Sequence, residues 1–190
     1  MPCSMESQYL LQTPWTIWYD CKAKKNASTE EWQNNLHKVV TVTDVPTMLY
    51  AVENIEPLAD WPVSSNIHFF RDDIQPAWED KYNIGGGKWV FEIMKGDEGV
   101  DLQQVWKKTV LFCASECIPE ELICGAVFSA RKYVNRFAIW TNLKDSSVLD
   151  IGKQWRELVN LENYPSYFFR SHQDNLEGGQ YWTKNIYSLE

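Results

Sequence analysis

Residues 76–80 (Pro-Ala-Trp-Glu-Asp) place the indole of Trp78 directly before the carboxylate of Glu79, in a stretch without helical or strand periodicity. A second tryptophan, Trp32, also lies in a polar loop. Two loop indoles can hold a flat ring between them, and a neighbouring carboxylate can accept hydrogen bonds from the edge of that ring. A guanine edge offers two adjacent N–H donors, and methylation at N7 adds a positive charge that indole faces attract. The pattern predicts a pocket for 7-methylguanine.

Basic residues gather near the tip of a predicted β-hairpin. Residues 123–129 and 137–141 have the apolar, β-branched and aromatic composition of strands, and Arg131, Lys132 and Arg136 lie between or beside them. One interpretation is a solvated basic turn without a ligand. The other is a phosphate site, because the arginine fork can bind two phosphate oxygens at once.

The composition limits the classes of function. The net charge of −8 and the pI of about 4.9 argue against broad binding to a nucleic-acid backbone, although a local basic patch remains compatible with them. A generic single-stranded RNA-binding module is therefore the weaker alternative. No apolar run has the length of a membrane span, and no secretory signal precedes the first strand, so the cytoplasm is the expected location, with the nucleus as the alternative.

Catalytic and metal sites are not expected. Asp72, Asp73, Glu79 and Asp80 are the best candidates for a hydrolytic centre, but they form no metal-binding motif and no nucleophile–base pair. The five cysteines are predicted to be free and mostly buried, with Cys113 and Cys117 on one helix. The three histidines do not cluster with them, so we expect neither a metal nor a cofactor. The run of three glycines at 85–87 lacks the lysine motif of a phosphate loop.

The elements that must position these residues can be read from periodicity and capping signals. Strands are expected at 15–19, 37–43, 66–70, 88–94, 123–129, 137–141 and 167–169. One helix should begin after Thr43 or Asp44, a second after Asp101 and a third after Ser146 or Ser147. The apolar face of the second helix is expected to reach Cys117, and that of the third to include Leu158. The sequence predicts one α+β domain over residues 1–190 with an antiparallel sheet, and with residues 1–12 flexible.

The chain resembles the eukaryotic translation initiation factor 4E family of mRNA cap-binding proteins. The resemblance covers the chain from about Trp15 to its end. The residues that carry it, in order, are Trp15 and Trp18, Trp32, residues 76–80, residues 86–89 (Gly-Gly-Lys-Trp), residues 124–127 (Cys-Gly-Ala-Val), residues 138–141 (Ala-Ile-Trp-Thr), and Ser171 with His172. It implies a curved antiparallel sheet with three helices on its convex face and a cap slot on its concave face.

The resemblance also implies individual roles. Trp32 and Trp78 look like the stacking indoles, and Glu79 like the carboxylate that reads the guanine edge. Trp140 is similar to the tryptophan that touches the N7-methyl group. The cap phosphates would be bound by three basic residues, Arg131, Arg136 and Lys88, with Arg136 standing where the family more often has lysine.

The departures from the family lie on the face that would bind a protein partner. The resemblance implies a scaffold or a 4E-binding protein docking on the convex helices. Val45 and Leu111 keep apolar contacts, but Leu49 stands where the family has tryptophan, and Lys108 where it has an acidic residue. A reversed charge would repel standard partners, so we expect altered partner choice. Initiation and a repressing or storage role both remain open. Gly178 replaces a basic residue of the last loop.

Overall fold

A computed structural model describes residues 9–21, 35–115, 117, 122–161, 167–173 and 185–189. In this part of the chain, eight strands form one sheet in the order β2-β1-β3-β5-β6-β4-β7-β8, and every neighbouring pair is antiparallel. The strands are β1 (Leu10–Asp20), β2 (Leu36–Asp44), β3 (Asn66–Arg71), β4 (Gly87–Met94), β5 (Ile123–Ala130), β6 (Val134–Thr141), β7 (Tyr167–Ser171) and β8 (Tyr187–Leu189). The helices are α2 (Val45–Glu53), α3 (Leu102–Ala114), α4 (Val148–Val159) and the short 3-10 helix η2 (Leu58–Asp60).

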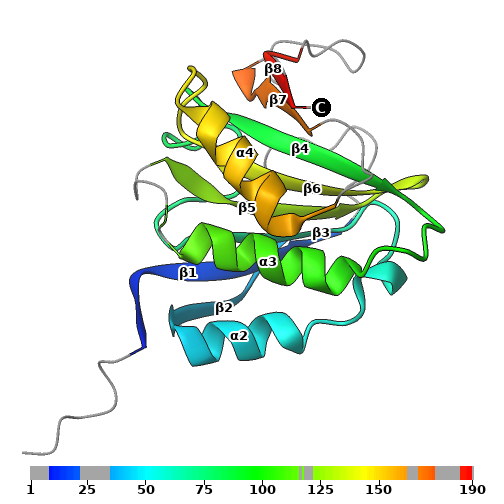
Figure 1. The fold of residues 1–190 in the computed structure, drawn as a ribbon. Helices are drawn as coiled ribbons and strands as arrows, with labels where there is room; N and C mark the ends of the chain where they lie inside the picture. The colour runs from blue at the N-terminus through cyan, green and yellow to red at the C-terminus, as the bar shows by residue number, and fades with distance from the viewer. Residues whose placement is uncertain are drawn as a thin grey trace, which may run out of the picture.

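The sheet separates two hydrophobic clusters. Helices α2, α3 and α4 lie across one face of the curved sheet (Figure 1), and the large core between them contains Trp15, Trp89 and Phe91. The second cluster is smaller and includes Phe70, Val90 and Trp140. Because successive side chains of a strand point to opposite faces, Val90 faces away from the helices while Trp89 and Phe91 face them. The α+β architecture predicted from the sequence is confirmed.

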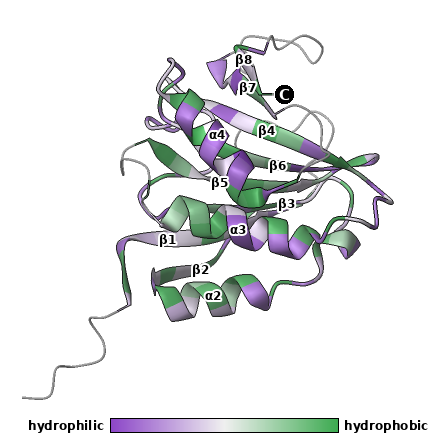
Figure 2. Cartoon of the chain, in the orientation of Figure 1, coloured by the Kyte–Doolittle hydropathy of each residue, from purple (hydrophilic) through white to green (hydrophobic). Residues whose placement is uncertain are grey.

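Strand β5 lies near the middle of the sheet and is buried along its whole length. It is hydrophobic almost throughout (Figure 2), which suits a strand with protein on both sides. Gly125 within it is required by close packing, because a Cβ there would lie 2.5 Å from the ring of Phe70. The central strands are therefore fixed tightly against one another, and they provide a rigid base for the side chains on the concave face.

The predicted caps are confirmed for two helices, and for the third only the position of the cap is confirmed. The carboxylates of Asp44 and Asp101 accept hydrogen bonds from the third backbone N–H that follows each of them, at 2.8 and 3.1 Å. Ser147 precedes α4 but makes no capping hydrogen bond. Instead, Asp145 accepts hydrogen bonds from both the backbone N–H and the hydroxyl of Ser147.

Other expectations need correction as well. Helix α3 ends at Ala114, so Cys117 lies beyond it and is exposed. Leu158 of α4 is 43% exposed and does not belong to the buried face. Strand β1 begins at Leu10, within the segment that was expected to be flexible, and β8 was not predicted as a strand. The four described cysteines are free, but only Cys113 and Cys124 are buried, whereas Cys21 and Cys117 are exposed, so the expectation that most are buried does not hold for them.

Candidate functional site

The loop that carries Trp78 is irregular but firmly held. The carboxylate of Asp80 accepts hydrogen bonds from the backbone N–H groups of Gln75 and Tyr82, at 3.1 and 2.9 Å. The fully buried Asn83 donates from Nδ2 to the carbonyls of Gln75 and Ala77, both at 2.8 Å. These bonds close the loop on itself, and Asp80 is thereby a structural residue. The loop presents Trp78 with 37% of its surface exposed.

Beside Trp78, the exposed carboxylate of Glu79 makes no hydrogen bond or ion pair with the described residues. A carboxylate that accepts no bond within the protein can accept two from a ligand. Its neighbour Asp80 is occupied by the loop, so Glu79 is the acidic side chain of this segment that is available for binding. The loop thus presents an exposed indole and an available carboxylate next to each other, which is the arrangement that the pocket predicted from residues 76–80 requires.

Lys88 brings the Trp78 loop and the sheet together. Its Nζ lies 5.6 Å from the ring centre of Trp78 and 5.7 Å from that of Trp140. The link to Trp140 follows from strand register, because Lys88 of β4 pairs with Trp140 of β6. Three residues that are distant in the sequence thus gather on the face of the sheet away from the helices. The two indoles and a cation between them can receive a flat ring that bears an anionic group.

A cluster of cationic side chains extends from Lys88 along the same face. Arg136, Arg170 and Arg131 lie close enough to affect its ionisation. Burial lowers the pKa of Lys88 to about 8, and the positive charges of the three arginines act in the same direction. Burial and the charge of Arg136 likewise lower the pKa values of Arg131 and Arg170. Cations that depress one another's pKa values form a site that favours an anion, since the anion relieves their repulsion.

Each arginine of the cluster has an anchor. Arg136 donates from Nε and Nη2 to the carboxylate of Glu92, at 2.7 and 2.5 Å. Arg131 donates from Nη2 to Oδ1 of Asn66 at 2.8 Å, and Arg170 donates from Nε to Asn185 at 3.0 Å. The cations are therefore oriented before any ligand arrives, which reduces the cost of ordering them on binding.

Trp140 forms the floor of the site and is 6% exposed. Phe70 meets it edge-on, with ring centres 5.4 Å apart, and His172 lies 4.2 Å away. Burial lowers the pKa of His172 to about 3, and the charge of Lys88 adds to this effect. His172 is therefore neutral at ordinary pH and contributes a packing surface rather than a charge to the basic cluster.

The structure brings together most of the predicted ligand-binding residues. Trp78, Glu79, Lys88 and Trp140 belong to one region, and Arg131 and Arg136 to the adjoining cationic cluster. Trp32 lies outside the described residues, as does Gly178. Lys132 is exposed at the hairpin turn, with its Nζ over the ring of Tyr133. No group of three or more potential metal ligands occurs in the described part of the chain.

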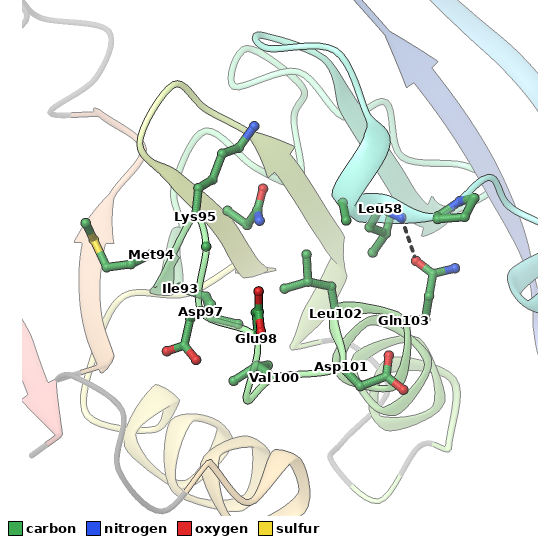
Figure 3. A pocket seen from close by; sticks show the side chains of 14 residues that line it. Leu58, Ile93, Met94, Lys95, Asp97, Glu98, Val100, Asp101, Leu102 and Gln103 are labelled. Carbon is green, nitrogen blue, oxygen red and sulfur yellow. Dashed lines mark hydrogen bonds between the residues drawn. The ribbon is translucent and has the colours of Figure 1, made fainter.

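A separate cavity of about 440 Å³ lies between the end of β4, the start of α3 and η2. The residues labelled in Figure 3 include Ile93, Leu102 and Glu98. One side is closed by a hydrogen bond of 2.9 Å from the backbone N–H of Leu58 to Oε1 of Gln103. None of the residues predicted to bind a ligand lines this cavity.

The family model for eukaryotic initiation factor 4E matches residues 10–186. The chain belongs to this family. The eukaryotic translation initiation factor 4E of Candida glabrata is 35% identical over 170 residues, which cover 88% of this chain and 79% of the relative.

Solved structures of initiation factor 4E proteins share the fold. Ascaris suum eIF4E-3 in complex with an m2,2,7G cap superposes with a TM-score of 0.82 at 22% identity, covering 95% of this chain and 98% of that one. A schistosome eIF4E complexed with m7GpppG and 4E-BP gives the same TM-score, with 22% identity and coverage of 95% and 98%. Among the described residues, no helix has the length and apolar composition needed to cross a membrane.

The helix side of the sheet carries the residues predicted to contact a protein partner. Val45, Leu49 and Leu111 are partly buried and pack against the helix-side core. Lys108 donates from Nζ to the carbonyl of Val159 at 3.1 Å, at the C-terminal end of α4. That end of a helix carries partial negative charge. The ammonium of Lys108 is thus directed toward α4 and stabilises it, a role that the sequence did not predict.

Two residues of the cationic site were missed by sequence reasoning. Arg170 follows the predicted strand 167–169, and its pairing with Lys88 appears only in the register of β4 and β7. Glu92 lies opposite Arg136 in the register of β4 and β6. Strand alternation could have placed Glu92 on the same face as Lys88. The sequence alone does not show, however, that the strand carrying Arg136 lies beside it. No sequence pattern indicated Asn83, because the hydrogen bonds by which it closes the Trp78 loop depend on the path of that irregular loop.

Proposed function

We propose that the protein binds the 7-methylguanosine cap of mRNA and acts in translation initiation, in the cytoplasm. The observation that carries the proposal is the convergence of Trp78 and Trp140 on Lys88, next to the carboxylate of Glu79, which makes no hydrogen bond or ion pair with the described residues. Its membership of the initiation factor 4E family supports the same conclusion. Trp32 is proposed as the second stacking indole.

Each part of the cap has a matching group in the site. The methylated base would stack on Trp78 and donate two hydrogen bonds to Glu79, while Trp140 forms the floor near the methyl group. The triphosphate would extend over the cluster formed by Lys88, Arg131 and Arg136. Stacking contributes about 1–3 kcal/mol per base, a desolvated cation–π contact about 2 kcal/mol, and a charge-assisted hydrogen bond about 1.5–3 kcal/mol. After the costs of association, these contributions give an affinity of about micromolar or tighter.

Tryptophan fluorescence provides the test. Titration with 7-methyl-GTP should quench the emission strongly, whereas GTP should bind much more weakly because it lacks the cationic ring. The variant Trp78→Ala should lose most of this response, and Glu79→Gln should lose discrimination in favour of guanine. The control is Trp61→Phe, because Trp61 packs beside Tyr19 and Phe128 in the helix-side part of the structure. Equal affinities for the two nucleotides would refute the proposal.

The proposed activity is binding without chemical conversion. A capped dinucleotide incubated with the protein and magnesium should therefore be recovered intact, and the appearance of cleaved product would point to an enzyme instead. Uncapped RNA should bind weakly. Tight binding to it, with a steep dependence on salt, would favour the single-stranded RNA-binding module.

We further propose that a scaffold or a 4E-binding protein docks on the convex helices with altered specificity. The partly buried apolar residues Val45, Leu49 and Leu111 support a docking surface there. Leu49 offers less contact area than the tryptophan that the family resemblance implies, and Lys108 places a positive charge nearby. Partners with acidic residues facing Lys108 would suit this surface, and a repressing or storage role would follow if the usual scaffold is excluded.

A further inference from the structure

A chain of buried and partly buried hydrogen bonds runs from β1 to the basic cluster. Nε2 of His68 lies 2.7 Å from Oδ2 of Asp20. The other oxygen of Asp20 accepts a hydrogen bond of 2.6 Å from Nδ2 of Asn66. Oδ1 of Asn66 in turn accepts the hydrogen bond of 2.8 Å from Nη2 of Arg131. Four side chains from β1, β3 and the β5–β6 turn are therefore linked in series.

The first two members of this chain are almost completely inaccessible to solvent. Asp20 is 3% exposed and His68 is 4% exposed. A buried carboxylate is costly unless its oxygens are hydrogen-bonded, and here each oxygen has one partner. The strand register brings the partners into place, because Asp20 pairs with Asn66, and Trp18, two residues earlier, pairs with His68. The position of Asn66 is thus determined by the buried pair and not by solvent.

The amide of Asn66 can act in only one orientation. Its Nδ2 must face the carboxylate of Asp20, which only accepts hydrogen bonds, and its Oδ1 must face the guanidinium of Arg131, which only donates them. The guanidinium is held on a second side by a hydrogen bond of 3.1 Å from Nη1 to the carbonyl of Ala130. Within the described part of the chain, Nε of Arg131 makes no hydrogen bond, and it remains free to donate to a phosphate oxygen.

Asp20 also acts on Arg131 through its charge. Burial and the nearby Arg136 lower the pKa of Arg131, whereas the negative charge of Asp20 opposes this effect. This chain of hydrogen bonds from His68 through Asp20 and Asn66, called the relay below, therefore supplies both an acceptor that fixes the guanidinium of Arg131 and a buried anion that compensates its charge. Arg136 obtains the same two contributions directly, from the carboxylate of Glu92.

We infer that Asn66, held in place by the Asp20–His68 pair, is a positioning residue that aligns Arg131 for the phosphates of the ligand. This inference rests on the proposed function, since it assigns the residues behind one cation of the same site. Asn66 need not touch the ligand. Its contribution is to hold the long side chain of Arg131 in the binding geometry before the phosphates arrive. The entropy cost of ordering that side chain therefore does not weaken binding.

Calorimetric titration with 7-methyl-GTP and with 7-methylguanosine tests the inference, because the nucleoside lacks the phosphates. The variant Asn66→Ala should lower the affinity for 7-methyl-GTP about fivefold to tenfold, and the affinity for 7-methylguanosine less than about twofold. The control Asn135→Ala removes an equally small amide that is 5% exposed, on β6 one residue before Arg136, and should leave both affinities unchanged. Thermal unfolding verifies that each variant is folded, and Asn66→Ser replaces Asn66→Ala if it is not.

A double-mutant cycle with Arg131→Ala distinguishes positioning from a general structural role. If Asn66 acts through Arg131, then Asn66→Ala should change the triphosphate affinity less than about twofold once Arg131 is absent. Equal losses for nucleotide and nucleoside, full additivity of the two substitutions, or no loss at all would overturn the inference. If the wild type binds GTP as well as 7-methyl-GTP, the proposed function fails, and the relay is then judged with GTP and guanosine. Absence of any triphosphate binding overturns both.

Discussion

The lowered pKa of Lys88 makes the affinity for a triphosphate depend on pH in a predictable direction. With a pKa of about 8 in the free protein, about nine in ten Lys88 side chains are protonated at pH 7 and about one in ten at pH 9. A bound triphosphate favours the ammonium and keeps it protonated over this range. As pH rises through 8, a growing fraction of the free protein must first take up a proton. The dissociation constant for 7-methyl-GTP should therefore rise about tenfold between pH 7 and pH 9.

The matched control for this measurement is Lys88→Arg, because a guanidinium stays charged throughout the range. Any titration of the ligand affects both proteins equally, so it cancels in the ratio of their dissociation constants. Calorimetry at half-unit steps of pH should show this ratio, wild type over variant, nearly constant below pH 7, bending upward near pH 8 and rising about tenfold between pH 7 and pH 9. A ratio that stays constant from pH 6.5 to 9.5 would refute the reasoning, since it would mean that Lys88 keeps its proton or does not contact the phosphates.

Three further predictions concern other parts of the molecule. Lys108→Glu should lower the free energy of unfolding by about 1–2 kcal/mol, because it removes the hydrogen bond to Val159 and places a negative charge at the end of α4. Lys95→Glu serves as the control, since it makes the same change of charge away from α4, and equal melting temperatures for the two variants would contradict this. Leu49→Trp should increase the affinity for a 4E-binding-protein peptide in calorimetry, and unchanged affinity would argue against docking at that residue. Gly152→Ala should cost about 1–3 kcal/mol in chemical unfolding, because its Cβ would lie 2.5 Å from the ring of Trp89; a gain in stability, as expected for an exposed helix, would show that α4 can shift.

The fold could be predicted largely because local signals agreed with one another. The alternation along residues 88–94, and the caps Asp44 and Asp101, each determine local structure without help from distant residues. The errors occurred where a short sequence allows two outcomes. Ser147 occupies the N-cap position of α4, but its hydroxyl donates to the carboxylate of Asp145 and makes no hydrogen bond to the helix.

The candidate site could be predicted only in part, for a physical reason. Trp78 and Glu79 were visible because their composition is unusual for a polar loop. The contributions of Asn66, Glu92 and Arg170 depend on which strands lie side by side, and strand order cannot be read from periodicity. The position of Lys108 at the end of α4 likewise depends on how two helices pack. Each of these residues looked like an ordinary polar side chain until its neighbour across the fold was known.

The alternation of side chains along strand β4 affects how the sequence of this protein can vary during evolution. Its even-numbered residues Lys88 and Glu92 contribute to the cationic face, while Trp89 and Phe91 contribute to the core beneath the helices. A substitution at one set therefore leaves the contacts of the other set largely in place. Changes at Lys88 or Glu92 would alter the cationic face, whereas changes at Trp89 or Phe91 would alter the packing beneath the helices. The ligand-facing and core-facing residues of this one strand can therefore vary separately.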